Sequence, residues 1–140
     1  MKQEVTKRLP VQKERRANDL LRCSVIGTLK LFATKWKPCI ICYLSAGSMR
    51  YNDLCRSIPN ISRKMLSEHL RELETDRLII RQEHDPKKQR VEYMLSDKGR
   101  SLLTILNHLQ DWGLEHLTGV VSIKEMLSFT RQPAISSLCP

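Results

Sequence analysis

The chain has 140 residues, a length typical of one domain with short extensions, and 41% of them are hydrophobic, enough for a modest core. Its 24 lysines and arginines outnumber its 15 aspartates and glutamates, for a formal net charge of +9. That excess favours a polyanionic partner, with nucleic acid ahead of an anionic membrane surface. An odd count of five cysteines, with no signal peptide and no membrane-spanning stretch, argues against a secreted disulfide scaffold and indicates a cytoplasmic protein.

The first third of the chain predicts a loose segment followed by two helices. Residues 1–14 are polar and basic and predict a flexible arm, while residues 15–22 could open a helix. Apolar residues then recur at helical spacing, at Val25, Ile26, Leu29 and Phe32. Pro38 suits the first turn of the next helix, where its missing N–H costs nothing, and Gly47 is expected to end that helix.

The middle of the chain predicts two short helices joined by a tight turn. The first helix covers residues 51–57, and the turn follows at 58–61. Within the turn, Pro59 disfavours helix at the residue before it, and Asn60 tolerates a left-handed backbone. Ser62 is a good N-cap for the second helix, which is expected to run to about residue 75.

A β-hairpin and a long helix should complete the domain. Residues 78–83 and 91–95 predict two strands around a polar loop at 84–90 with a basic tip. Ser96 is expected to cap a helix over 97–117, with Leu102, Leu103, Ile105, Leu106, Leu109 and Trp112 facing inward. The order of elements predicts a mainly α fold with a small β-hairpin, the winged helix-turn-helix.

The helix that Ser62 begins has one apolar and one polar side when plotted at about 100° per residue. The apolar side comprises Met65, Leu66, Leu70 and Leu73, with His69 among them as a core histidine. The polar side comprises Arg63, Lys64, Ser67, Glu68 and Arg71. Such a helix fits the major groove of DNA, and we assign Arg63 and Ser67 to base edges. The alternative is an ordinary surface helix, but the preceding short helix and tight turn favour DNA recognition.

Further residues are candidates for contacts with DNA phosphates. Lys64 and Arg71 lie on the same helix and could contact either base edges or phosphates, and Ser62 would combine its cap with a phosphate contact. Arg50 and Arg56 flank the first helix of the motif. In the β-hairpin, which forms the wing of this fold, the candidates are Lys87, Lys88 and Arg90. For the wing the alternative is a solvated hairpin tip, because charged tips are common.

The cysteines allow more than one interpretation. Cys39 and Cys42 form a Cys-x-x-Cys motif, but a structural zinc site needs four ligands and no second pair follows, so we expect buried core thiols. Cys23 lies near a helix start and close to the arginines of residues 15–22, which could lower its pKa; the alternative is an inert, half-buried thiol. The sequence contains no catalytic Ser/His/Asp set, paired carboxylates or phosphate-binding glycine loop, so we expect neither an enzyme nor a cofactor or metal.

Several segments taken together resemble one family. They include Thr34-Lys35-Trp36-Lys37-Pro38 after Cys23, then Ile58-Pro59-Asn60-Ile61-Ser62, and then Arg90-Val91-Glu92-Tyr93. In this order and spacing, over roughly residues 23–117, the chain resembles the HxlR-type regulators. The resemblance implies a homodimeric winged helix-turn-helix repressor or activator of small bacterial operons, and of the two we expect a repressor. It also implies dimerisation through the N-terminal helices and the long C-terminal helix.

The resemblance further implies a sensor, because several HxlR-type regulators detect electrophiles or oxidants through a cysteine at the position of Cys23. The chain departs from the family pattern at two places that follow this cysteine. Ser24 stands where Pro usually follows the cysteine, and Ala33-Thr34 replaces a Gly-Gly pair, which puts sensing in question more than DNA binding. Asn60 replaces a turn glycine, and Arg77 stands where Gly often ends the recognition helix.

The sequence therefore predicts a sequence-specific transcriptional regulator that binds a palindromic operator in double-stranded DNA as a homodimer. We expect a domain over residues 15–117 that includes the dimerisation helices, and a partly disordered extension over 118–140 with one short helix at 123–129. Two rival functions remain open. One is a thiol oxidoreductase using Cys39 and Cys42, and the other is a basic protein–protein adaptor that has kept the fold without binding DNA.

Overall fold

The computed structural model describes residues 22–32, 34–88 and 90–129, and the chain divides into two compact units after residue 33. The arm expected at 1–14, the segment 15–21 and the tail beyond 129 lie outside the described residues. Across the described ranges, no helix has both the length and the apolar character that crossing a membrane requires.

The first unit contains α2 (Ser24–Leu31), which confirms the helix predicted from its apolar spacing. Cys23 is the N-cap of α2, with an extended backbone at φ −62° and ψ 126°, and Phe32 is the C-cap rather than part of the helix. The side chains of Val25 and Leu29 are 62% and 52% exposed. Within the described residues of the first unit, α2 therefore has an apolar face that is left uncovered.

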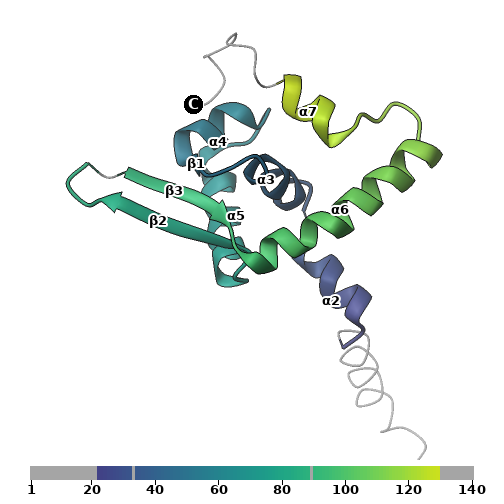
Figure 1. The fold of residues 1–140 in the computed structure, drawn as a ribbon, viewed down its shortest axis with the longest axis horizontal. Coiled ribbons are helices and arrows are strands. Elements are labelled where there is room, and N and C mark those ends of the chain that lie inside the picture. The colour runs from purple at the N-terminus through teal and green to yellow at the C-terminus, as the bar shows by residue number, and fades with distance from the viewer. Residues whose placement is uncertain (1–21, 33, 89, 130–140) are drawn as a thin grey trace, which may run out of the picture. The chain divides into compact units, whose positions relative to one another are not determined.

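Three helices form the centre of the second unit (Figure 1): α3 (Trp36–Leu44), α4 (Tyr51–Ser57) and α5 (Arg63–Thr75). The bounds of α4 and α5 agree with the predicted ranges, whereas α3 ends at Leu44 and not at Gly47, where its end was predicted. Their inner faces bury Ile40, Ile41, Leu54, Leu66 and Leu73, each 0% exposed. Full burial of such a side chain stabilises a fold by about 1.5–3 kcal/mol, so these residues hold the three helices together.

The turn between α4 and α5 follows the sequence signals closely. Ile58 leaves the helix in an extended conformation, at φ −91° and ψ 110°, because the proline after it disfavours helix. Asn60 adopts a left-handed φ of 63°. The Ser62 hydroxyl then accepts a hydrogen bond from the N–H of Met65 at 3.1 Å and begins α5, which confirms the predicted cap.

Helix α5 ends in the double hydrogen bond of a Schellman motif. The N–H of Leu78 donates to the carbonyl of Leu73, and the N–H of Arg77 donates to that of Glu74, both at 2.9 Å. Arg77 adopts φ 58°, the left-handed conformation that Gly usually supplies there. The departure at Arg77 is therefore accommodated without loss of the helix end.

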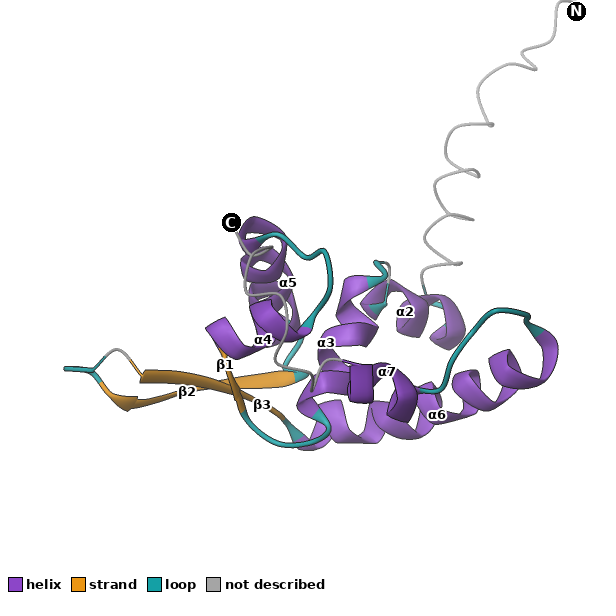
Figure 2. Cartoon of the chain, turned by 90° about the horizontal axis from the view of Figure 1, so that it is seen from above, coloured by secondary structure: helices purple, strands orange, loops and turns teal. Residues whose placement is uncertain are grey.

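A three-stranded antiparallel sheet of order β1-β3-β2 lies beside the helices: β1 (Met49–Arg50), β2 (Ile79–Asp85) and β3 (Arg90–Leu95). Ile79 pairs with Leu95 at its base, and Met49 pairs with Tyr93. Figure 2 shows the β2–β3 hairpin extending away from the helices of this unit as a wing. The sequence predicted the hairpin but missed β1, because two residues carry no alternation to detect.

The long helix α6 (Asp97–His116) begins at Ser96, whose hydroxyl accepts from the N–H of Gly99 at 3.0 Å and donates to the carbonyl of Arg77 at 2.6 Å. The short helix α7 (Ile123–Phe129) follows, as predicted. The side chain of Gln110 accepts from the N–H of Ile123 at 2.6 Å and ties the start of α7 to α6.

The inward face predicted for α6 is only half correct. Leu102 and Leu106 are buried, at 5% and 7% exposure. The prediction is wrong for Ile105, Leu109 and Trp112, which are 43%, 53% and 57% exposed. Their spacing of four and three residues places them on one side of the helix. The apolar pattern is real, but the described residues of the second unit leave this side exposed.

Candidate nucleic-acid interface

The two sides predicted for α5 are present in the structure. Leu66, His69, Leu70 and Leu73 are buried. Arg63, Lys64, Ser67 and Arg71 are exposed. Because the Ser62 cap fixes where the helix begins, it also fixes which residues occupy the outward positions. That these side chains contact DNA remains a prediction.

Two polar residues at the start of α4 form hydrogen bonds with the outer side of α5. The Tyr51 hydroxyl lies 2.9 Å from the carbonyl oxygen of Arg63 and 3.0 Å from the hydroxyl oxygen of Ser67. The side-chain oxygen of Asn52 accepts from the Arg63 guanidinium at 3.5 Å. The two residues assigned to base edges are thus held in place by the helix before them. Tyr51 and Asn52 were not predicted from the sequence, because their contacts depend on the angle between the helices.

The tip of the wing carries the predicted basic residues. Lys87, Lys88 and Arg90 are all exposed. The tip is closed by Asp85, whose carboxylate accepts from the N–H of Lys87 at 2.9 Å and whose carbonyl accepts from the N–H of Lys88 at 3.1 Å. The turn is therefore held through the backbone N–H groups of the two lysines, which leaves their side chains in solvent.

A cavity of about 590 Å³ lies between α4 and the wing. Its lining includes five cationic side chains, those of Arg50, Arg56, Arg81, Lys88 and Arg90, and one carboxylate, that of Asp53. Four of these cationic residues were predicted from the sequence as DNA contacts, and the fold brings them together. The fifth, Arg81, was not predicted. It shares a strand face with buried Ile79, two residues away, so period-two alternation along β2 could have found it. Such a hollow suits a phosphate group.

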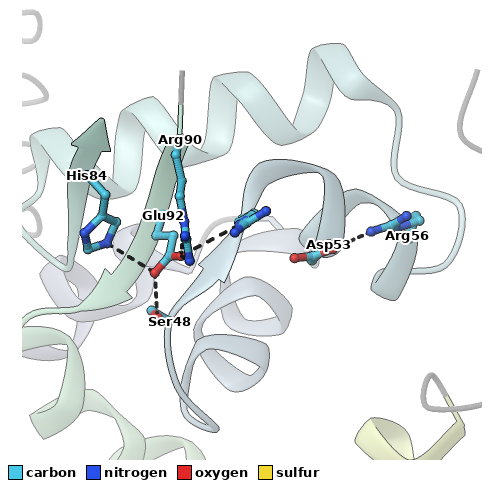
Figure 3. Close-up of polar contacts among 7 residues, drawn as sticks. Ser48, Asp53, Arg56, His84, Arg90 and Glu92 are labelled. Atoms are coloured by element: carbon cyan, nitrogen blue, oxygen red, sulfur yellow. Dashed lines mark hydrogen bonds and ion pairs between the residues drawn. The ribbon is translucent and has the colours of Figure 1, made fainter. Parts of the chain in front are cut away.

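Glu92, near the middle of β3, contacts four side chains that surround its carboxylate (Figure 3). Its carboxylate accepts from the Ser48 hydroxyl at 3.1 Å and from the Arg90 guanidinium at 3.2 Å. It also pairs with His84 at 3.3 Å and with Arg50 at 3.8 Å. The Ser48 hydroxyl, followed by Arg90, lowers the pKa of Glu92, so it stays ionised. Glu92 was not predicted from the sequence, although a carboxylate amid predicted phosphate contacts was a signal.

Other carboxylates hold the remaining arginines of the cavity. Asp53 pairs with Arg56 one turn along α4, and Glu83 pairs with Arg81 along β2 (the first pair is drawn in Figure 3). Exposed pairs of this kind contribute about 0–1 kcal/mol to stability. Here these ion pairs matter because they keep the long arginine side chains beside the cavity.

An ionic cluster joins α3 to the inner flank of α5. Lys37 is only 7% exposed, and its ammonium lies 2.8 Å from the carboxylate of Glu72. His69, at 8% exposure, lies 3.4 Å from the same oxygen, so the histidine predicted to lie in the core is buried and has a hydrogen-bond partner. Lys37 and then His69 lower the pKa of Glu72.

This cluster predicts a pH-dependent contribution to stability. The pKa of Glu72 is lower in the folded state than the ordinary value of about 4.3, so its contribution is complete above pH ~4.3 and is lost as the pH falls through the folded value. We expect Glu72→Gln to lower the free energy of unfolding by about 1 kcal/mol at pH 7, since the carboxylate is half exposed, and by less at pH 3. Urea unfolding at both pH values measures this, with exposed Glu74→Gln as the control. A pH-independent gap would contradict it.

Cys39 and Cys42 lie in the packed side of α3. Cys42 is 5% exposed and Cys39 is half-buried. Burial raises the pKa of both thiols to about 11. Thiolate is the reactive form in disulfide exchange, so this environment opposes an oxidoreductase role and supports the core interpretation. Among the described residues, no group of three or more His, Cys, Asp and Glu side chains is placed to hold a metal ion.

Cys23 has the opposite environment. It is exposed, and the backbone N–H groups of Ile26 and then Val25, at the start of α2, lower its pKa. The arginines at positions 15 and 16, which were expected near this thiol, lie outside the described residues. The cause visible in the structure is therefore the helix start itself.

Two short helices joined by a tight turn, with a basic hairpin beside them, define the winged helix-turn-helix class. The family model for the HxlR-like helix-turn-helix matches residues 31–120, and the chain belongs to that family. It is 45% identical over 97 residues to the HTH-type transcriptional regulator YtcD of Bacillus subtilis, covering 69% of this chain and 77% of YtcD. These findings place it among the transcriptional regulators of the helix-turn-helix type.

Solved structures show the same likeness. The crystal structure of YtcD has a TM-score of 0.64 at 44% identity and covers 67% of this chain and 96% of its own. Reduced YodB of B. subtilis has a TM-score of 0.64 at 30% identity, covering 71% and 98%. YodB has also been solved bound to quinone and after diamide treatment. HypR, described as a redox regulator, has a TM-score of 0.63 in its reduced form at 33% identity, covering 67% and 93%.

Proposed function

We propose that this protein binds duplex DNA sequence-specifically as a homodimer and represses transcription in the cytoplasm, without a catalytic role. The observation that carries the proposal is the exposed basic side of α5, which the Ser62 cap and Tyr51 hold in place beside the cationic cavity under the wing. An α-helix with such a side fits the major groove, and a cationic wing beside it fits the flanking phosphates.

In this proposal the candidate residues make two kinds of contact with DNA, to base edges and to phosphates. Arg63 and Ser67 contact base edges, because an arginine bonds two acceptors of guanine at once and a serine hydroxyl bonds single groups. The phosphate contacts come from Ser62, Lys64, Arg71, Arg50, Arg56, Lys87, Lys88 and Arg90, together with Arg81. Most of the attraction in this set is independent of sequence, and it positions the few residues that discriminate between bases.

Dimerisation is supported by the uncovered side of α6. Ile105, Leu109 and Trp112 form an apolar stripe, and Leu117 beyond the helix end is 51% exposed. Contiguous exposed apolar surface of this kind marks an interface in a soluble protein. A second copy of α6 would cover the stripe and present a second recognition helix, as a palindromic operator requires.

The experiment that tests DNA binding is a gel shift on duplex DNA from beside the protein's own gene, at several salt concentrations. A protein that neutralises six to ten phosphates loses about 10³- to 10⁵-fold in affinity between 50 and 200 mM salt. We expect a loss in that range, and weaker binding to a scrambled duplex of equal length. An affinity that changes less than threefold over this range would contradict the proposal.

We further propose that Cys23 makes the regulator responsive to thiol-reactive electrophiles or oxidants. Its lowered pKa and exposure are the properties that reactive cysteines share. The likeness to YodB and HypR, which were solved in chemically modified or oxidised forms, supports this assignment. Modification of Cys23 would act on the dimer and so on the spacing of the two recognition helices.

We expect diamide to weaken operator binding by the wild-type protein at least about tenfold and to leave Cys23→Ser unaffected, because only a thiolate reacts readily. The measurement is the same gel shift with and without diamide. Cys39→Ser is the matched control and should keep the wild-type response, since burial raises the pKa of that thiol. Equal inactivation of Cys23→Ser would show that the sensor lies elsewhere.

A further inference from the structure

The hydroxyl groups of Tyr51 and Ser67 form a chain of hydrogen bonds with a fixed direction. Tyr51 Oη lies 2.9 Å from the carbonyl oxygen of Arg63 and 3.0 Å from Ser67 Oγ. A carbonyl oxygen has no proton, so the single proton of Tyr51 is donated to it. The contact between Tyr51 and Ser67 then needs the proton of Ser67. The direction of this second hydrogen bond therefore follows from the first.

This direction decides what Ser67 can offer to a ligand. A serine hydroxyl has one proton and two lone pairs, and the proton of Ser67 is committed to Tyr51. Ser67 is exposed on the outer side of α5. It therefore presents only its lone pairs to a molecule approaching that side, and it acts as an acceptor.

We propose that Tyr51 is a positioning residue for specificity. Because Tyr51 accepts the hydrogen bond that Ser67 can donate, Ser67 selects a base with an exocyclic amino group. The inference rests on the proposed DNA-binding function. In the major groove, adenine N6 and cytosine N4 carry such donors, whereas guanine and thymine offer only acceptors and a methyl group. At the one position per half-site that Ser67 reads, adenine or cytosine is preferred over guanine or thymine.

The size of the preference follows from a single neutral hydrogen bond, which corresponds to about three- to tenfold in affinity. Tyr51→Phe keeps the aromatic ring and removes the hydroxyl. The Ser67 hydroxyl then turns, and it can donate to guanine or thymine as readily as it accepts from adenine or cytosine. The preference at that position should fall to less than about twofold.

The test is selection of bound duplexes from a pool with randomised half-sites, using wild type, Ser67→Ala and Tyr51→Phe. Ser67→Ala locates the position, because preference disappears there. Wild type should enrich adenine or cytosine at that position, and Tyr51→Phe should lose this enrichment while preferences at the other positions stay unchanged. Thermal unfolding checks that both variants are folded, and unchanged preferences elsewhere show that α5 keeps its place.

Each contrary outcome is distinct. Guanine or thymine at the Ser67 position in the wild-type selection overturns the inference and leaves DNA binding standing. So does full retention of the adenine or cytosine preference by Tyr51→Phe, or a Ser67→Ala variant that changes no position. A wild-type protein that enriches no sequence at all overturns the proposed function, and the inference with it.

Discussion

Replacing Arg63 with alanine is expected to abolish discrimination at one base position in each half-site. Arg63 occupies the first position of α5 and is exposed on its outer side. A bidentate contact between arginine and guanine discriminates against the wrong base by about 1–3 kcal/mol, so matched and singly substituted duplexes should become nearly equivalent. Competition binding with duplexes that differ at single positions measures the effect.

Lys64→Ala provides the matched control for Arg63, because it removes a neighbouring charge assigned to a phosphate. It should weaken binding to all duplexes alike, and it should reduce the slope of log affinity against log salt concentration by about one, since one phosphate fewer is neutralised. If Arg63→Ala behaved in the same uniform way, Arg63 would be a phosphate contact. If it changed nothing, the adaptor alternative would gain support.

The second large effect is expected at Gly99, where alanine should destabilise the fold by about 1–3 kcal/mol or more. A Cβ at this position would come within 2.0 Å of the Leu78 carbonyl oxygen, and 3.3 Å from a methyl group of Leu95. The carbonyl belongs to the backbone that leads into the wing and accepts from the N–H of Ser96 at 3.1 Å, so it cannot move freely. Urea unfolding measures the free energy directly.

Gly113→Ala is the matched control on the same helix. Its nearest neighbour would be a methyl group of Leu117 at 3.8 Å, an ordinary contact. Alanine inside a helix is favoured over glycine by about 0.5–1 kcal/mol, so this variant should be as stable as wild type or more so. Equal stability of the two variants would mean that α6 does not pack so closely against the base of the wing.

The sequence predicted those elements that carry local signals. The turn before α5 depends on Pro59 and Asn60, and the start of α5 depends on the hydroxyl of Ser62. These residues act on their own backbone, so no knowledge of distant contacts was needed. The exposed side of α5 followed in the same way, because the cap sets the phase of the helix.

Contacts between elements that lie far apart in the sequence have no such local signal. Strand β1 exists because Met49 and Arg50 pair with β3, more than forty residues later, as the register shows. Tyr51 gives no sign in the sequence that it meets Ser67, and Glu92 gives none that Ser48 donates to it. These contacts depend on the angle between packed elements, which the pattern of apolar residues does not encode.

The error on α6 has a different origin. Periodicity shows that Ile105, Leu109 and Trp112 form an apolar side, but it does not show which molecule covers that side. Within the described residues of the second unit this side is exposed, and the proposed dimer would cover it.

The most direct test of dimeric operator binding is a hydroxyl-radical footprint on the operator, combined with the number of chains bound per site. We predict two protected stretches related by two-fold symmetry, with centres one helical turn, about 34 Å, apart, and two chains per site. A single protected stretch occupied by one chain, or protection that ignores sequence, would contradict it.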